Sequence, residues 1–428
     1  MRDESSTRGA RQPVARHGQL TSPHPLAQIA KILAVVLVVA LIGTVSTAAF
    51  AVWNATQTVA DMSVELEGDV QLPPTIGEIE GGVNLLLVGT DSCEGQSLEL
   101  FPRCAEDEGG ERNDVTMLLH IGDNPRRVTV VSFPRDMMVP IPSCPDGEGG
   151  RYSAMSSQML NASYMYGGLA CTVLTVENLT GVDIQFAGAI RWTGVINMSD
   201  AIGGVDVCVA GQIDDGHTGL RLAEGTHTLV GAQALQFLRI RHGIGDGSDL
   251  GRISNQQQFM SSMVRKLQSG EVLSDAGTLF NLATTAMQQV TSGQLLLSET
   301  LANPTRMVQI AMAVKDVTYD DIVFVQYPTY YTPGGERVMP LTEAAGVLFT
   351  ALAENQPIAI SGKPSAGNSQ EVVGEAAPKP TPSASPSGSP VPTESGGAEV
   401  SVPEEVITLP DVITGQTAGQ VTCTTPER

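Results

Sequence analysis

Short apolar runs mark the predicted strands of a folded domain in the middle of the chain. They are rich in Val and Leu and are bounded by Gly, Pro or Asp, a pattern typical of buried strands. The runs cover residues 83–89, 115–121, 127–133, 205–209 and 322–326. We therefore expect a buried sheet built from these segments.

Helical periodicity appears between and after these runs. We expect helices near residues 156–166, 170–179, 192–202, 231–237, 251–268, 273–290, 298–314 and 341–354. Strands mixed with many helices predict a three-layer α/β/α domain around a central mixed sheet, which we place at residues 82–356. The Ala- and Met-rich helices between Leu273 and Val314 fit a core, although side chains that repack so easily could also line a lipid pocket.

An uncharged apolar run near the N-terminus predicts one transmembrane helix, which we place at residues 29–53. No charged residue occurs between Lys31 and Asp61, and the run is long enough to cross a hydrocarbon core of ~30 Å. The segment before it is rich in Arg, so the positive-inside rule keeps that segment in the cytoplasm and places the rest of the chain outside the cell membrane. A cleaved signal peptide, with a weak site at residues 49–51, is the alternative.

Three further segments flank the span and the domain. Residues 1–28 are polar and predict a cytoplasmic disordered segment, and residues 54–81 predict a stalk. Residues 357–428 predict a Pro- and Ser-rich disordered tail with a short acidic end. Within it, residues 375–398 contain one Val and no Leu, Ile or Phe, so burial cannot offset the entropy lost on ordering.

Composition narrows the class of partner. The chain has 24 Lys and Arg against 46 Asp and Glu, which gives a formal net charge of -22. Binding to a nucleic-acid backbone needs a basic surface, so we expect no nucleic-acid partner. Aromatic residues make up only 4% of the chain, which leaves few side chains for base stacking.

All six cysteines follow the apolar run, where an oxidising exterior favours disulfides. Sequence alone does not choose among the connectivities. Closeness in sequence favours Cys93 with Cys104, and next Cys144 with Cys171, which leaves Cys208 with Cys423. Zinc is the alternative, but no CxxC or HxxxH pair is present.

Two carboxylates and an arginine stand at the ends of neighbouring predicted strands. Asp91 comes just past the run NLLLVGT, Asp114 precedes the run VTMLLHI, and Arg135 stands in a Pro-Arg-Asp turn after the third strand. In open α/β sheets, ligands bind beyond the carboxyl ends of strands. Carboxylates can hold Mg²⁺ and Arg can bind phosphate bidentately. Taken singly, each residue also fits an ordinary turn or a surface salt bridge.

The segment LRIRHGIGDGSDLGRISNQQQF, residues 238–259, carries several further arginines. Arg239 and Arg241 alternate along a stretch that we expect to be extended, so both would point to one face. With the N-terminus of the next helix, they predict an anion site.

The start of that next helix supplies the remaining candidates. Asp249 is a suitable N-cap, and Arg252 and Gln256 share one helix face because they stand four residues apart. The alternative to an anion site is that the arginines form two ion pairs, one with Asp246 and one with Asp249.

These motifs resemble the LytR-CpsA-Psr family of membrane-anchored cell-wall ligases. The resemblance covers about residues 82–268, in the family's order. The matching pieces are NLLLVGTDS, RNDVTMLLHIGDNPRRVTVVSFPRDMMV, LNASYMYGG, GGVDV and GAQALQFLRIRHGIGDGSDLGRISNQQQF. The resemblance implies an α/β/α domain that binds a polyprenyl pyrophosphate-linked glycopolymer with Mg²⁺. It also implies transfer of the polymer to a peptidoglycan hydroxyl, with release of polyprenyl phosphate.

By the same resemblance, Asp91 and Asp114 would coordinate Mg²⁺ or organise its shell, and Asp249 would support the site or act as base. Members often have Ser or Thr where Asn113 stands, and often Arg where Asn255 stands. Without a guanidinium at position 255, the site would bind phosphate more weakly or use a different acceptor. The pyrophosphate would be bound by Arg135, Arg239, Arg241 and Arg252, with Gln256 beside them.

Two other functions use the same residues. One is a polyprenyl pyrophosphate phosphatase, with water as the acceptor. The other is a non-catalytic envelope-binding regulator, for which loss of Arg239 would leave the cellular role intact. Cytoplasmic transcriptional regulation conflicts with the predicted topology, because only about 30 residues would stay inside.

Overall fold

The computed structural model describes most of the chain between residues 82 and 361 and several shorter stretches. The described residues are 26, 28–39, 43, 62–67, 82–106, 110–269, 276–333, 337–361, 369–377 and 406–427. The chain divides into two units, Met1–Thr56 and Gln57–Arg428.

In the first unit, residues 28–39 form a helix whose Ile, Leu and Val side chains are more than half exposed. Among the described residues, no helix combines the length and apolarity needed to cross a membrane. Most of the predicted span at residues 29–53, and most of the segment 1–28, lies outside the described residues.

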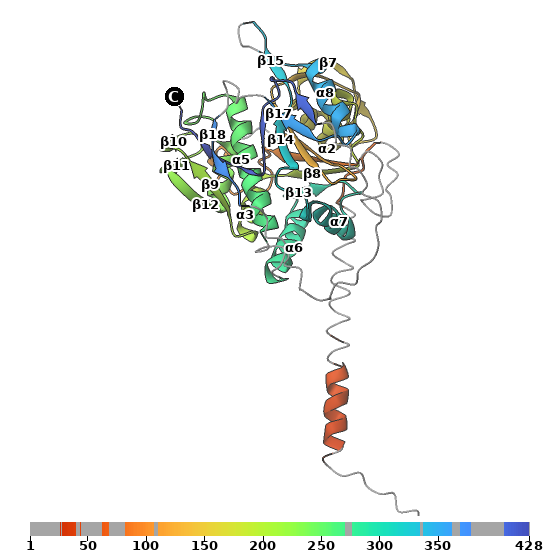
Figure 1. The fold of residues 1–428 in the computed structure, drawn as a ribbon. Coiled ribbons are helices and arrows are strands. Elements are labelled where there is room, and N and C mark those ends of the chain that lie inside the picture. The colour runs from red at the N-terminus through yellow and green to blue at the C-terminus, as the bar shows by residue number, and fades with distance from the viewer. Residues whose placement is uncertain are drawn as a thin grey trace, which may run out of the picture. The chain divides into compact units, whose positions relative to one another are not determined.

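A mixed seven-stranded sheet forms the centre of the second unit (Figure 1). Strands β1, β2 and β3 form an antiparallel meander, and β8 and β14 join it in parallel on either side. In spatial order the strands are β13 (Leu295–Leu297), β8 (Phe186–Ile190), β1 (Val83–Thr90), β2 (Asn113–Ile121), β3 (Val128–Phe133), β14 (Ile322–Gln326) and β20 (Gly415–Thr417).

Smaller sheets surround the central one. A four-stranded sheet has the order β12 (Gly225–Leu229), β9 (Val205–Val209), β21 (Gln420–Thr424) and β18 (Gln370–Glu375). The two-stranded pairs are β4 (Met138–Ile141) with β7 (Met155–Met159), β5 (Cys144–Pro145) with β6 (Arg151–Tyr152), β10 (Ile213–Asp215) with β11 (Leu220–Leu222), β15 (Thr329–Tyr331) with β16 (Val338–Pro340), and β17 (Ile358–Ile360) with β19 (Ile407–Leu409).

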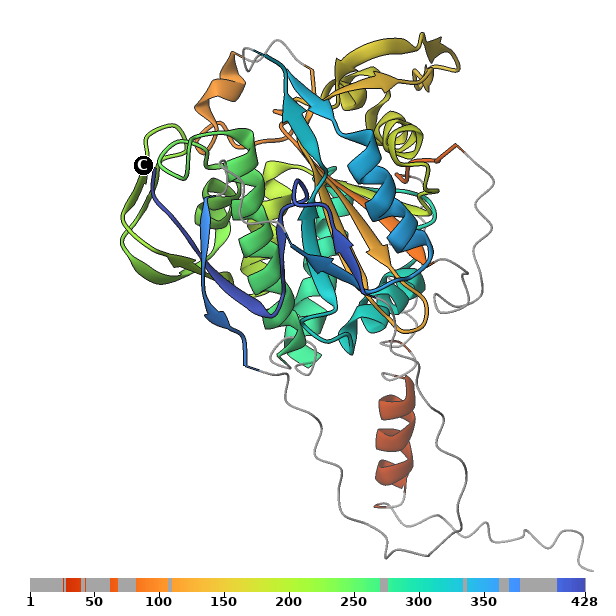
Figure 2. The same ribbon diagram turned by 45° about the horizontal axis from the view of Figure 1, so that its top comes forward.

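Helices cover both faces of the central sheet (Figure 2). Helices α2 and α8 pack on one face, and α5, α6 and α7 pack on the other. The described helices of the second unit are η2 (Pro102–Ala105), α2 (Ala162–Thr180), α3 (Trp192–Ala201), α4 (Gly231–Arg239), α5 (Asp249–Gln268), α6 (Ala276–Thr291), α7 (Pro304–Lys315) and α8 (Thr342–Ala353).

The alternation of side chains along β1 explains why both faces must be covered. Leu86 and Val88 point into the core beneath α2 and α8, whereas Val83 and Leu85 point into the core beneath α6 and α7. A strand that is apolar on both sides is stable only when both sides are buried. The predicted three-layer α/β/α domain with a central mixed sheet is confirmed.

Helices α6 and α7 contribute directly to this core. Val290 and Ile310 are buried against the sheet beside Phe186. These described residues therefore match the core interpretation of this region rather than an open lipid pocket.

Some predicted elements differ from the structure. The helix expected at 156–166 begins only at Ala162, because Met155–Met159 pairs with β4 as strand β7. Helix α2 then departs from helical geometry at Gly167 and Gly168. The helix expected at 298–314 begins at Pro304.

The predicted disordered tail is wrong for residues 357–361, 369–377 and 406–427, which contain strands β17–β21. Strand β20 pairs with β14 in the central sheet, and β21 pairs with β9. These segments bury apolar side chains such as Leu409 and Ile413, which makes their ordering favourable. The boundary at residue 356 is therefore too early, while residues 378–405 of the tail lie outside the described residues.

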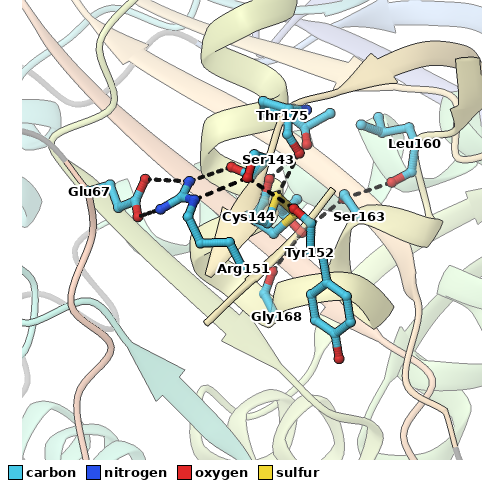
Figure 3. The surroundings of a disulfide bond; sticks show 12 residues. Glu67, Ser143, Cys144, Arg151, Tyr152, Leu160, Ser163, Gly168 and Thr175 are labelled. Atoms are coloured by element: carbon cyan, nitrogen blue, oxygen red, sulfur yellow. Dashed lines mark hydrogen bonds and ion pairs between the residues drawn. A yellow bond between two sulfur atoms is a disulfide. The ribbon is translucent and has the colours of Figure 1, made fainter. Parts of the chain in front are cut away.

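The three predicted disulfides are present: Cys93–Cys104, Cys144–Cys171 and Cys208–Cys423. Part of the predicted stalk also packs on the domain, because the Val64 N–H donates to the Leu297 carbonyl at 2.8 Å. Figure 3 shows Glu67 paired with Arg151 beside the disulfide at Cys144.

Candidate functional site

The ends of β2 and β3 bring together the first two candidate residues. Asp114 lies at the start of β2, and Arg135 follows the end of β3, its antiparallel neighbour. An Nη1 group of Arg135 donates to Oδ1 of Asp114. Arg135 also lies near Asp136, with Nε 3.4 Å from Oδ1. The salt-bridge interpretation of this turn is thus correct, but the pair is partly buried rather than exposed.

Helix α5 joins this pair through Arg252. Nη2 of Arg252 donates to the backbone carbonyl of Asp114 at 2.9 Å and lies 2.6 Å from Oδ1 of Asp249. Nη2 of Arg241 donates to the same Asp249 oxygen at 2.9 Å. One carboxylate oxygen therefore orients two guanidinium groups.

The alternative of ion pairs with Asp246 and Asp249 is found at Asp249, whereas Asp246 forms no ion pair with the described residues and its carboxylate accepts the Ser248 N–H. The N-cap of α5 is Ser248 rather than Asp249, because the Ser248 hydroxyl accepts the Gly251 N–H. Asp249 instead occupies the first helical residue, where its charge suits the helix dipole.

Arg239 is the last residue of α4 and does not belong to an extended stretch. Its guanidinium carbon lies 4.3 Å from the ring centroid of Trp192 at the start of α3. A cation over an indole face is attracted to the ring electrons, and this attraction helps to hold the guanidinium in place. Trp192 is a residue that sequence reasoning missed, and the sequence offers no local signal for this contact.

The charges around Asp114 act on its ionisation. Burial favours the neutral acid, but the positive charges of Arg252, Arg135 and Arg239 outweigh burial and lower the pKa of Asp114 below its ordinary value. Arg239 therefore belongs to the same electrostatic cluster as Arg135 and Arg252. For Arg241, burial and the nearby charge of Arg252 lower the pKa. This mutual repulsion of arginines would be relieved by a bound anion.

Three buried polar atoms at this cluster lack a hydrogen-bond partner within the described part of the chain. They are Oδ2 of Asp249, Nε of Arg252 and Nε of Arg135. The side chains of Asp249 and Arg252 are 8% and 5% exposed. A buried polar group without a partner is costly. Such groups are expected where a ligand completes the hydrogen bonding.

Asp91 lies at the same end of the sheet as Asp114. Thr90 pairs with Asn113 across β1 and β2, so Asp91 and Asp114 flank one strand pair. Oδ1 of Asp91 accepts the Arg112 N–H at 2.8 Å, as in the turn-forming interpretation.

The predicted Mg²⁺ site at Asp91 and Asp114 has few protein ligands. In the described stretches, no group of three or more His, Cys, Asp or Glu side chains could hold a metal ion. Mg²⁺ can, however, bind through one or two carboxylates when phosphate oxygens and water complete its shell. The donor types of Asp91 and Asp114 fit that case.

Gln256 and Asn255 serve the fold beside the site. Nε2 of Gln256 donates to the Leu238 carbonyl at 2.9 Å, and Nδ2 of Asn255 donates to the Phe237 carbonyl at 2.7 Å. Both amides hold the last turn of α4, which carries Arg239. The sequence indicated a contact of Gln256 with the anion, and the structure gives it this supporting bond.

A further partly buried ion pair, at Arg191, was also missed by sequence reasoning. Its Nε and Nη2 groups bind the two carboxylate oxygens of Glu111 at 3.1 and 3.0 Å. The Glu111 carboxylate also accepts the hydroxyl of Thr90. This pair connects the ends of β1 and β8, next to Asp91 and Trp192.

Comparison with known proteins assigns this chain to a family. The sequence model described as the LytR_cpsA_psr family matches residues 49–341. The cell wall biosynthesis protein LcpA of Corynebacterium glutamicum is 29% identical over 232 residues, which cover 49% of this chain and 45% of LcpA. The polyisoprenyl-teichoic acid–peptidoglycan teichoic acid transferase TagU of Bacillus anthracis is 31% identical over 199 residues, which cover 46% of this chain and 57% of TagU. The chain thus spans about half the length of the curated relatives it matches.

Among solved structures, TagT of B. subtilis is 20% identical with a TM-score of 0.48, covering 68% of this chain and 99% of TagT. The LytR-Csp2A-Psr enzyme of Actinomyces oris is 22% identical with a TM-score of 0.47, covering 68% of this chain and 95% of that enzyme. Because these TM-scores are below 0.5, the assignment rests on the family model, which spans more than half of the chain. This chain, with its arginines gathered around Asp114 and Asp249, belongs to the LytR-CpsA-Psr family.

Proposed function

We propose that this protein transfers a glycopolymer from a polyprenyl pyrophosphate carrier to a hydroxyl group of peptidoglycan and releases polyprenyl phosphate. The observation that carries the proposal is a cluster of arginines around the carboxylates of Asp114 and Asp249 on a protein of net charge -22. The arginines are Arg135, Arg239, Arg241 and Arg252. TagU, a relative, is named as a transferase of this kind.

The arginines would contribute to the reaction by electrostatic stabilisation of the phosphate groups. The oxygen of the acceptor hydroxyl would attack the sugar-linked phosphorus, forming one P–O bond. The bond from that phosphorus to the bridging oxygen would break, and the electron pair would leave with polyprenyl phosphate. Phosphoryl transfer depends mainly on positioning and charge stabilisation, so fixed guanidinium groups would hold the donor and neutralise the charge on the leaving phosphate.

The contacts of Asp249 favour a positioning role over that of a base. Its Oδ1 atom is engaged by Arg241 and Arg252, which fixes both guanidinium groups toward one point. The hydroxyl proton would then pass to another acceptor or to water. Oδ2 of Asp249, buried and without a partner in the described residues, would accept a hydrogen bond from the bound lipid-linked substrate.

Mg²⁺ is part of the proposal, with Asp91 and Asp114 as its protein ligands and the pyrophosphate oxygens completing its shell. When bound, it would supply additional positive charge at the pyrophosphate. Removal of divalent ions with a chelator should abolish turnover, and added Mg²⁺ should restore it.

We also propose that the N-terminal apolar run anchors the protein in the cell membrane, with the folded unit outside. The exposed apolar side chains of the helix at residues 28–39 support this. A fluorescent reporter that folds only in the cytoplasm, fused after residue 60, should stay dark. A bright reporter would contradict the topology.

The test of the activity is product analysis. The full-length chain in detergent is mixed with Mg²⁺, a polyprenyl pyrophosphate-linked oligosaccharide labelled on the sugar, and an uncrosslinked glycan strand. We expect label on the glycan strand. Label released as free phosphosugar, whether or not the strand is present, would instead indicate a phosphatase. Binding of the donor without any turnover would favour a binding protein.

A further inference from the structure

The loop between Arg241 and Asp249 is rich in residues that give it conformational freedom. Gly243, Gly245 and Gly247 all have positive φ values, of 82°, 52° and 75°. Three glycines in so short a loop make its ordering entropically expensive. The Arg241–Asp249 ion pair spans this loop, and contacts from another part of the chain would lower the entropic cost of forming it.

The last residues of the chain supply that restraint. The carboxylate of Glu427 accepts the Gly243 N–H at 2.9 Å, and the Glu427 N–H donates to the Gly243 carbonyl at 3.0 Å. The Gly245 N–H donates to the Thr425 carbonyl at 3.2 Å. Residues 425–427 therefore run alongside the loop as a short antiparallel partner, with a bridge from Pro426 to Ile244.

Ser369 connects this segment to the first turns of α5. The Ser369 hydroxyl donates to the Gly251 carbonyl at 2.7 Å, and the Ser369 N–H donates to the Ser254 hydroxyl at 3.1 Å. The Thr425 N–H donates to the Ser369 carbonyl at 2.7 Å. These bonds flank Arg252, which lies between Gly251 and Ser254.

A third set of contacts fixes the segment to the domain. The Thr424 hydroxyl is fully buried and lies 2.5 Å from the side-chain oxygen of Asn255. Cys423 is joined to Cys208 in β9. The restraint on the loop is thus connected to the rigid part of the fold rather than to a free end.

We propose that residues 369–370 and 422–427, the C-terminal clamp, position Arg241, Asp249 and Arg252 for the pyrophosphate, with Glu427 as the positioning residue that holds the loop. The clamp lies beyond residues 49–341, which the family model matches. The inference rests on the proposed function, because it assumes that these arginines bind a pyrophosphate.

The test uses the full-length chain in detergent and two measurements. Hydrogen exchange followed by mass spectrometry reports on the loop, residues 241–248, and titration calorimetry reports the Kd for inorganic pyrophosphate. The variants are Glu427→Ala, Glu427→Gln and a deletion of residues 425–428. Glu375→Ala, at an exposed position at the end of β18, is the matched control.

We expect Glu427→Ala to speed exchange in the loop and raise Kd about threefold to tenfold, as the loss of one hydrogen bond of ordinary net strength implies for an exposed side chain. The deletion should have a larger effect, because it removes all three backbone contacts. Glu427→Gln keeps an acceptor oxygen and should stay within about twofold of the wild type, as should Glu375→Ala.

Three results would overturn the clamp. They are unchanged exchange in the loop of both Glu427→Ala and the deletion, faster exchange without any change in Kd, and an equal loss of binding in Glu375→Ala. Failure of the wild-type chain to bind pyrophosphate would contradict the proposed function first, and the clamp with it.

Discussion

At the scale of single residues, Arg252 connects the two parts of the candidate site. Its guanidinium reaches the backbone of β2 at Asp114 and the carboxylate of Asp249 on its own helix. Arg241 reaches the same carboxylate from the preceding loop. The geometry therefore concentrates positive charge where three elements meet, which a single ion pair would not do.

A residue away from the site makes the fold sensitive to acid. His120 is 5% exposed in β2, and burial lowers its pKa to about 4. Between about pH 6.5, its ordinary pKa, and pH 4, the unfolded chain binds more protons than the folded one, so the free energy of unfolding falls as the pH falls through this window. The loss should be on the order of 3 kcal/mol. Urea unfolding at pH 7 and pH 4.5 measures it.

His120→Gln provides the comparison, because glutamine keeps hydrogen-bonding groups but does not titrate. The variant should lose less stability than the wild type between the two pH values, even if it is less stable at pH 7. Equal losses in the two proteins would show that His120 is not responsible.

At the scale of secondary structure, helix α2 changes direction at a pair of glycines beneath a disulfide. A Cβ atom at Gly167 would lie 2.7 Å from the Pro145 carbonyl oxygen and 2.8 Å from the Cβ of Cys171. Gly168 has a φ of 61° and a ψ of -147°, a conformation that favours glycine. The turn after the kink can thus pack against Cys144–Cys171 only because side chains are absent there.

Gly167→Ala should lower the free energy of unfolding by about 1–3 kcal/mol, because backbone and disulfide atoms must shift to admit the methyl group. Gly346→Ala is the matched control, since that glycine is exposed within α8 and has nothing within 4 Å of its Cβ position. The control should be neutral or should raise the stability by about 0.5–1 kcal/mol. Chemical denaturation of both variants checks this, and equal effects would refute the steric argument.

The sequence was most informative where local pattern decides the structure. Strands such as Val83–Thr90 and Val128–Phe133 are apolar on both faces, and the pattern needs no partner to be recognised. Met155–Met159 was misassigned because its five residues pair with β4, a partner that the local pattern does not reveal. The sequence predicts an extended stretch at Arg239 because alternation over three residues cannot be distinguished from the end of a helix.

At the scale of the whole molecule, pairing between distant segments shapes both the fold and the site. Thr417 pairs with Val323 in the central sheet, and Cys423 is bonded to Cys208 across 215 residues. Local pattern does not predict the strand pairing of this segment, which explains why the sequence predicts disorder there even though it leaves Cys423 to pair with Cys208. The arginines were predicted from their motifs, but their convergence on Asp249 and on the carbonyl of Asp114 needed the fold.

The long-range disulfide should stabilise the molecule more than the short one. A cross-link that closes a longer loop removes more entropy from the unfolded chain. Replacing Cys208 and Cys423 together by Ser should lower the free energy of unfolding by about 2–5 kcal/mol, and replacing Cys93 and Cys104 should cost less, because those residues are only 11 apart. Guanidinium denaturation of the two double variants would check the order. The reverse order would show that loop length does not decide it.

The central claim, that the arginine cluster binds the pyrophosphate and neutralises the leaving phosphate, is tested most directly by kcat/KM for transfer of labelled glycopolymer to a glycan strand. Arg252→Ala is compared with Arg126→Ala, a partly exposed arginine at the opposite end of the β2–β3 hairpin. Arg252→Ala should lower kcat/KM by about 100-fold or more, as expected for the loss of one charged group that stabilises a transition state. Arg126→Ala should leave it within about twofold. A similar kcat/KM in the two folded variants would contradict the account.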